Sequence, residues 1–162
     1  MQVAPPLRLN AEWLVVEMEY LTDHETLFSL SSATRKPLAT LQDWDAATEA
    51  VHAALSDAQA RVLTPAGGPE EGEVQRRPYV HGDVRLNNVM VRDDGGAWSV
   101  KFIDFDWAGV DGQGHYPALM NVEVEWPGGA GPLCVMRAVH DNELLATQCR
   151  GARERIASRA AS

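Results

Sequence analysis

The sequence predicts one α+β domain, mainly helical, with a short β-hairpin close to the functional residues. Three observations support this fold class. The chain has 162 residues, 45% of them hydrophobic and 23% charged, which is typical of a globular domain with a single core. Apolar residues recur at helical spacing within 41–63. Two strand-like runs within 88–104 flank an Asp-Gly turn signal.

The N-terminal part is expected to begin with a buried strand. In EWLVVEMEYL, residues 12–21, an apolar run extends from Trp13 to Val16. The next stretch, TDHETLFSLSS at 22–32, is typical of a turn followed by a short helix. The run TPAGGPEEGEVQRR at 64–77 is rich in Gly, Pro and charge, so we expect a loop exposed to solvent.

A longer helix is expected over 41–63. Thr40 and Asp43 resemble an N-terminal cap pair, in which each residue satisfies a backbone amide of the other. One face of this helix carries the apolar side chains, which are Val51, Ala54, Leu55, Ala58 and Val62.

The hairpin is predicted from NVMV, RDDGGA and WSVKFID, which follow one another over 88–104. In the second strand, Trp98, Val100 and Phe102 alternate with more polar residues and should share one face. Because a hairpin brings its two ends together, Asn88 at its start and Asp104 at its end should be neighbours.

These two residues offer the chemistry of a metal site. Asn88 supplies an amide oxygen and Asp104 a carboxylate, and such hard oxygen ligands suit Mg²⁺. Asp83 lies on the same loop and can accept a proton from a hydroxyl. A base beside two metal ligands, without a covalent nucleophile, is the set of groups that phosphoryl transfer needs.

The motifs resemble those of protein kinases. HGDVRLNN at 81–88 has the His-x-Asp-x-x-x-x-Asn spacing of the kinase catalytic loop, and IDFD at 103–106 resembles the Asp-Phe-Gly metal motif. The run VEMEYL resembles a kinase hinge. With DFDWAG and the later YP, MN and WPGGA blocks, the chain looks most like divergent kinase-like proteins of mushroom-forming fungi. The HGD sequence also resembles aminoglycoside and choline-type kinases.

The resemblance implies the large-lobe portion of a protein-kinase-like fold, with ATP and Mg²⁺ as cofactors. Asp83 would be the catalytic base, Arg85 would contact the transferred phosphate, and His81 would be structural. Asn88 and Asp104 would bind the metal. The nucleotide would be held by Met18 as gatekeeper, by the backbone of Glu19 and Leu21, and by Met90 and Ile103 at the floor of the adenine pocket.

The implied domain is partial. Residues 1–149 would form the kinase-like part, with a hinge at 13–22, a catalytic loop at 81–88 and a metal motif at 104–106, and 150–162 would form a basic tail. No Gly-rich phosphate loop or strand lysine precedes the hinge, so the small lobe is largely missing. A gene fragment, a mispredicted gene product and a decayed paralogue all stay open as explanations.

Two substitutions within the motifs matter. Gly82 occupies the position of an arginine that pairs with a phosphorylated activation loop in many regulated kinases, so we expect no dependence on such phosphorylation. Asp106 replaces the last glycine of the metal motif, which restricts the backbone and adds a carboxylate near the metal.

Charge and composition exclude several classes of partner. The net charge of −9 disfavours nucleic acid and acidic membranes, because both repel an acidic protein. No apolar run approaches the length of a membrane span, and no secretory signal core is present. The two cysteines, Cys134 and Cys149, form no zinc motif, nor do His115, His140 and Asp141. We therefore expect a cytoplasmic or nuclear protein, with no prediction of its oligomeric state.

The sequence leaves three functions open. The first is a phosphotransferase that moves the ATP γ-phosphate to a hydroxyl, on a protein Ser/Thr or on a small molecule. The second is a pseudokinase or truncated large lobe that binds partners without catalysis. The third is a metal-dependent phosphoesterase that uses His81, Asp83, Asp104 and Asp106.

Overall fold

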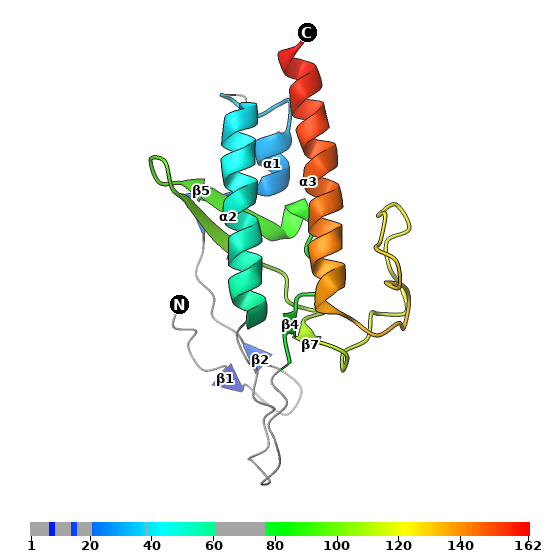
Figure 1. Cartoon of the computed structure of the whole chain (residues 1–162). Coiled ribbons are helices and arrows are strands. Elements are labelled where there is room, and N and C mark those ends of the chain that lie inside the picture. The colour runs from blue at the N-terminus through cyan, green and yellow to red at the C-terminus, as the bar shows by residue number, and fades with distance from the viewer. Residues whose placement is uncertain (1–6, 9–13, 16–20, 38, 61–76) are drawn as a thin grey trace.

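The computed structural model describes residues 7–8, 14–15, 21–37, 39–60 and 77–162. Within these residues the architecture is α+β, with three α-helices and small antiparallel sheets, which confirms the predicted class (Figure 1). The helices are α1 (Leu27–Ser31), α2 (Leu41–Ala60) and α3 (Ala138–Ala160). Helices α2 and α3 lie side by side, and α1 packs against α3.

The start of α2 confirms the predicted cap pair. The Thr40 amide donates to Asp43 Oδ2 at 2.9 Å, and the Asp43 amide donates to Thr40 Oγ1 at 3.1 Å. Aspartate therefore fulfils the role that glutamate or glutamine more often has at this position. The short helix α1 was also predicted, and Thr26 caps it by accepting from the Ser29 amide. The predicted end of the α2 helix, at 61–63, lies outside the described residues.

The predicted hairpin forms the larger part of a three-stranded sheet. Strand β5 (Val89–Asp93) pairs antiparallel with β6 (Trp98–Phe102), in a register that joins Val89 to Phe102 and Asp93 to Trp98. On the other side β5 pairs with β3 (Glu25–Thr26), which the sequence did not predict because two residues show no periodicity. The side chains predicted to share a face, those of Trp98, Val100 and Phe102, pack on the core.

Two further pairs of short strands complete the described sheets. Strand β1 (Leu7–Arg8) pairs with β2 (Leu14–Val15), which falls within the predicted N-terminal strand. Strand β4 (Tyr79–Val80) pairs with β7 (Gly109–Val110) and so brings the start of the polar loop at 81–88 beside the segment that follows Asp104.

The main core lies between the helices and the hairpin. Its members are Leu27 and Leu30 of α1, Trp44, Ala47, Val51 and Leu55 of α2, Val89 and Val91 of β5, and Leu145, Cys149, Ala152 and Ile156 of α3, with Ala39, Val84 and Leu86. Residues 150–160, expected to belong to a basic tail, continue α3 and contribute two of these core residues. Among the described helices, none combines the length and the apolar character needed to cross a membrane.

Candidate functional site

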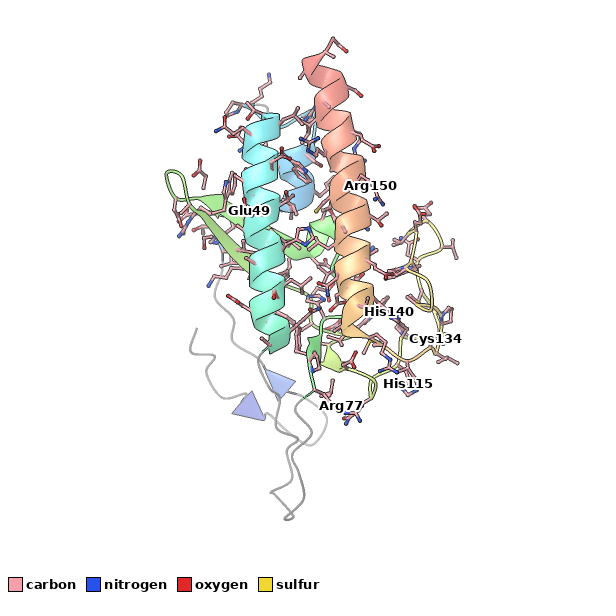
Figure 2. All side chains as sticks on the ribbon, viewed as in Figure 1. Glu49, Arg77, His115, Cys134, His140 and Arg150 are labelled. Atoms are coloured by element: carbon pink, nitrogen blue, oxygen red, sulfur yellow. The ribbon has the colours of Figure 1, made fainter. Side chains whose placement is uncertain are left out.

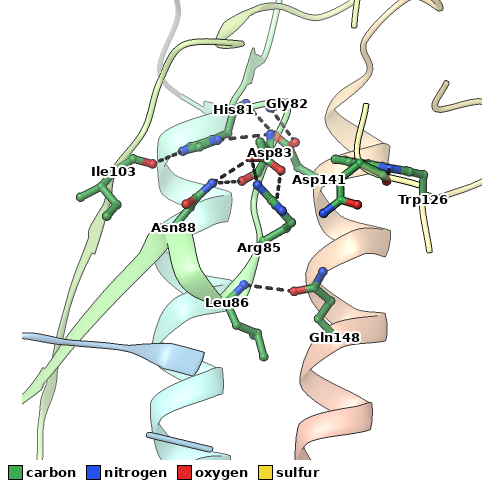
Figure 3. A network of polar contacts seen from close by, with 11 residues as sticks. His81, Gly82, Asp83, Arg85, Leu86, Asn88, Ile103, Trp126, Asp141 and Gln148 are labelled. Carbon is green, nitrogen blue, oxygen red and sulfur yellow. Dashed lines mark hydrogen bonds and ion pairs between the residues drawn. The ribbon is translucent and has the colours of Figure 1, made fainter. Parts of the chain in front are cut away.

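The polar loop at 81–88 is largely buried, and three of its five polar side chains lie inside. It connects β4 to a 3₁₀ helix at Leu86–Asn88, and the exposed fractions of His81, Asp83 and Asn88 are 1%, 5% and 7%. Buried polar groups are destabilising unless they are hydrogen-bonded, so each of these side chains needs a partner. Figure 3 shows the network that supplies them.

Asp141, in the first turn of α3, anchors the start of the loop. Its carboxylate accepts from the backbone amides of His81 at 2.7 Å and Gly82 at 2.9 Å, and its side chain is 1% exposed (Figure 3). Burial raises the pKa of Asp141 to about 6, while the two amide donors act in the opposite direction. Sequence reasoning considered Asp141 only as a zinc ligand and missed this role, because the contact spans about 60 residues.

His81 connects the loop to the residue before Asp104. Its Nε2–H donates to the carbonyl oxygen of Ile103 at 3.0 Å, and its Nδ1 accepts from the Asp83 amide at 3.4 Å. Burial lowers the pKa of His81, which agrees with a neutral ring that donates at one nitrogen and accepts at the other. The structural role implied for His81 thus has a geometric basis.

The Asp83 carboxylate is fully paired. Arg85 forms a two-pronged ion pair with it, with Nε at 2.6 Å from Oδ1 and Nη2 at 2.7 Å from Oδ2. The Asn88 amide nitrogen donates to Oδ2 and to the Asp83 carbonyl oxygen, both at 3.0 Å. The sequence did not predict the pairing of Asp83 with Arg85, although residues two apart in an extended segment lie on the same side.

Asn88 and Asp104 lie at the open end of the hairpin, as its geometry predicted. The Ile103 amide donates to the Asn88 carbonyl oxygen at 3.0 Å, so Asp104 immediately follows the residue opposite Asn88. Asp104 is exposed and adopts a left-handed backbone conformation with φ +64°. A non-glycine residue in this region is uncommon, and such conformations cluster at functional sites.

The donor set at this end fits Mg²⁺. Because the amide nitrogen of Asn88 is used by Asp83, the amide oxygen is left as a possible ligand, and the Asp104 carboxylate faces solvent. Two protein oxygens suffice for Mg²⁺, which keeps several waters and shares phosphate oxygens. Among the described residues, no group of three or more His, Cys, Asp or Glu side chains could hold a metal ion.

The residues expected to hold the nucleotide are described only in part. Met18 and Glu19 lie outside the described residues, whereas Leu21 is described and half-buried. Met90 pairs with Lys101 in the hairpin and alternates with the buried Val89 and Val91. Met90 and Ile103 therefore belong to the sheet face turned away from the core, and both are half-buried.

Gly82 is required by its conformation and by close packing. Its φ is +83°, and a Cβ there would lie 2.9 Å from the Met136 sulfur and 3.1 Å from the Trp107 Cβ. Trp107 in turn packs with Tyr116 and Trp126, with ring centroids 6.2 and 5.8 Å away. An arginine at this position would therefore be strained in the observed conformation of the loop.

A pocket of about 510 Å³ opens beside Arg85 and Leu86; we call it the Arg85 pocket. Its floor includes Gln148 of α3, whose Oε1 accepts from the Leu86 amide at 3.1 Å. Its rim includes Glu123 and Glu125 of the long segment 111–137. The pocket therefore lies next to the Asp83–Arg85 pair.

Asp106 is exposed and forms no part of the buried network. His115 and Cys134 lie on the long segment 111–137, as Figure 2 shows, and neither belongs to the loop at 81–88. No protein-family model matches the chain, and the comparisons with curated proteins and with solved structures found no match.

Proposed function

We propose that the chain is a kinase-like phosphotransferase that moves the γ-phosphate of ATP to a hydroxyl group. The observation that carries this proposal is the convergence of the loop at 81–88 with the end of the hairpin. Asp83 binds Asn88 directly, and His81 binds the carbonyl of the residue before Asp104. These buried hydrogen bonds support a site in which Asp83 would serve as base and Asn88 and Asp104 would supply oxygen ligands. The kinase-like fold is part of the same proposal.

In the proposed reaction the acceptor hydroxyl oxygen attacks the γ-phosphorus, the bond to the leaving ADP oxygen breaks, and Asp83 takes the hydroxyl proton. Asp83 must first be released from Arg85, which now occupies both carboxylate oxygens. A phosphoryl group offers Arg85 an alternative anion, so Arg85 exchanges its partner as the substrates bind. Mg²⁺ on Asn88 and Asp104 would supply neutralisation of phosphate charge. A protein Ser/Thr or a small-molecule hydroxyl can serve as the acceptor.

A binding module without turnover is the second candidate. The observation that favours it is the closed Asp83–Arg85 pair, which places a charged donor on each carboxylate oxygen and so lowers the tendency of Asp83 to accept a proton. The phosphoesterase alternative has less support. Both ring nitrogens of His81 are used by Ile103 and Asp83, so His81 has no lone pair to offer a metal.

The test compares Asp83→Asn and Asp104→Asn with the parent chain. Calorimetry with ATP and Mg²⁺ should give weak binding that Asp104→Asn abolishes and Asp83→Asn preserves, because only Asp104 is a charged metal ligand. Phosphate transfer from labelled ATP to a Ser/Thr peptide library should fall about a hundredfold to ten-thousandfold in Asp83→Asn.

Each remaining outcome selects another function. Binding of ATP without any transfer favours the binding module. Release of phosphate from a phosphoester in the absence of ATP favours the phosphoesterase. Unchanged transfer by Asp83→Asn would rule out the proposed base.

A further inference from the structure

A groove runs along α3 from the Arg85 pocket to the last turns of the helix. A second pocket, of about 840 Å³, lies between α1 and the C-terminal end of α3; we call it the Arg159 pocket. The two pockets share Phe28, Gly151 and Arg155 as lining residues, so they adjoin along α3. Phe28, which is 51% exposed, lies where they meet.

The Arg159 pocket contains a buried cation without a partner. The two terminal nitrogens of the Arg159 guanidinium are buried, and neither has a hydrogen-bond partner among the described residues. Glu154 lines the same pocket, yet no ion pair joins it to Arg159 within the described part of the chain. Although these two nitrogens are covered, the residue as a whole is partly exposed, so its side chain can turn toward the open pocket. There an incoming carboxylate would satisfy both nitrogens through two parallel hydrogen bonds.

The charges of the groove change along its length. The Arg85 pocket balances Arg85 and the shared Arg155 against Glu123 and Glu125, whereas the Arg159 pocket sets Arg155 and Arg159 against Glu154 alone. The chain as a whole carries −9, but at physiological salt charges more than about 8 Å away are largely screened. A local pair of arginines can therefore attract an anion onto an acidic protein.

The length of the groove fits an extended chain. Gln148 in the Arg85 pocket and Arg159 are separated along α3 by about 16 Å at 1.5 Å per helical residue. This distance equals about five residues of extended polypeptide at roughly 3.3 Å each. The exposed Phe28 between the two ends offers apolar contact to such a segment.

We propose that this groove binds an extended polypeptide segment, and that an acidic side chain of the segment enters the Arg159 pocket. If the segment is also the phosphate acceptor, which rests on the function proposed above, its hydroxyl lies about five residues from the acidic side chain. Binding itself needs neither nucleotide nor metal.

The test uses labelled probe peptides and no nucleotide. The acidic probe carries one serine, two glutamates five and six positions away, and alanine elsewhere; a matched probe has lysine in place of glutamate. Fluorescence anisotropy at 0.15 M salt should show binding of the acidic probe alone. Arg159→Gln should weaken that binding at least tenfold, because it removes the two-pronged partner of the carboxylate.

Arg150→Gln is the matched control. It removes the same charge from the same helix, but Arg150 lines a different pocket beside Trp126 and projects from the face of α3 turned away from α1 (Figure 2). Binding of the acidic probe by this variant should stay within about twofold of the parent chain, because screening limits the effect of a distant charge.

Several results overturn the proposal. These are equal binding of the two probes, no binding of the acidic probe, or equal losses in Arg159→Gln and Arg150→Gln. Binding of inorganic phosphate at Arg159 without binding of the peptide also overturns the assignment to a polypeptide. A lower melting temperature of Arg159→Gln with unchanged peptide binding would assign Arg159 a structural role only. Because nucleotide is absent, failure here leaves the proposed phosphotransfer untouched, and failure of ATP binding leaves this proposal untouched.

Discussion

At the residue scale, His81 is held as an uncharged ring between Ile103 and Asp83. Since burial lowers its folded-state pKa, the unfolded chain takes up a proton near pH 6.5 that the folded chain does not bind. The contribution of His81 to stability is therefore present above pH 6.5 and is lost as the pH falls below it. Urea unfolding between pH 7.5 and 5.5 should show this loss, and His81→Gln should reduce its slope. Nitrogen NMR shifts that place the titration of this ring above pH 6.5 would contradict the expectation.

Gly82 permits a second prediction at the same scale. Gly82→Ala should destabilise the fold by about 1–3 kcal/mol, because the new Cβ meets Met136 and Trp107 while the backbone stays left-handed. Gly95 is a matched control, since its φ of +82° is nearly the same but nothing lies within 4 Å of its Cβ position. Urea unfolding should show a clearly smaller loss for Gly95→Ala. Equal losses would mean that backbone conformation alone accounts for the effect.

At the element scale, Asp141 joins α3 to the loop at 81–88. Asp141→Asn leaves only one acceptor oxygen for two amide donors, so one buried N–H loses its partner. We expect a loss of about 1–3 kcal/mol in the free energy of unfolding, measured with urea at pH 7.5. Asp45→Asn is the control, because Asp45 forms an exposed ion pair with Arg153 and should matter far less. A negligible change in Asp141→Asn would show that the anchor is dispensable.

The stability contributed by Asp141 changes with pH in the opposite direction to that contributed by His81. Burial raises the folded-state pKa of Asp141 to about 6, above its usual value near 4. The pH-dependent part of its contribution to stability is thus fully present below pH 4 and is lost as the pH rises through 6, whereas the ionised carboxylate still accepts both amide hydrogen bonds at pH 7.5. Comparing Asp141→Asn with the parent chain over pH 4–7 should isolate this contribution.

Elements built from local contacts were predictable, whereas contacts between distant segments were not. The Thr40–Asp43 cap and the hairpin follow from neighbouring residues with fixed spacing, and both formed as expected. The pairing of β3 with β5 and the bond from Asp141 to the loop depend on how separate elements pack. No periodicity or spacing in the sequence encodes such contacts.

At the scale of the whole molecule, one core joins all three helices to the hairpin. Ile156, near the end of α3, is 2% exposed and belongs to that core, although its surroundings in sequence are basic. Ile156→Ala should lower the free energy of unfolding by about 2–5 kcal/mol, through lost burial and the cavity left behind. Val139→Ala changes a half-exposed position of the same helix and should lower the free energy of unfolding far less. Urea unfolding of both variants measures the difference. If the two variants lose similar amounts of stability, the end of α3 does not belong to the core.

The candidate site was predictable to the extent that its residues lie on one loop and one hairpin. Spacing alone singled out Asp83, Asn88 and Asp104, and the hairpin brought the last two to the same end. The pairing of Asp83 with Arg85 was not predicted, because a loop arginine can equally well extend into solvent. The partner of the loop in α3 lay too far along the chain to be assigned.

The left-handed conformation of Asp104 also bears on how this chain can evolve. Glycine, and to a smaller degree asparagine, adopts φ near +64° more readily than aspartate, so the fold itself exerts little selection for a carboxylate there. Glycine or asparagine at position 104 should therefore carry no penalty in folding. Under the proposed function, a carboxylate at this position would be retained for its charge and not for its backbone conformation.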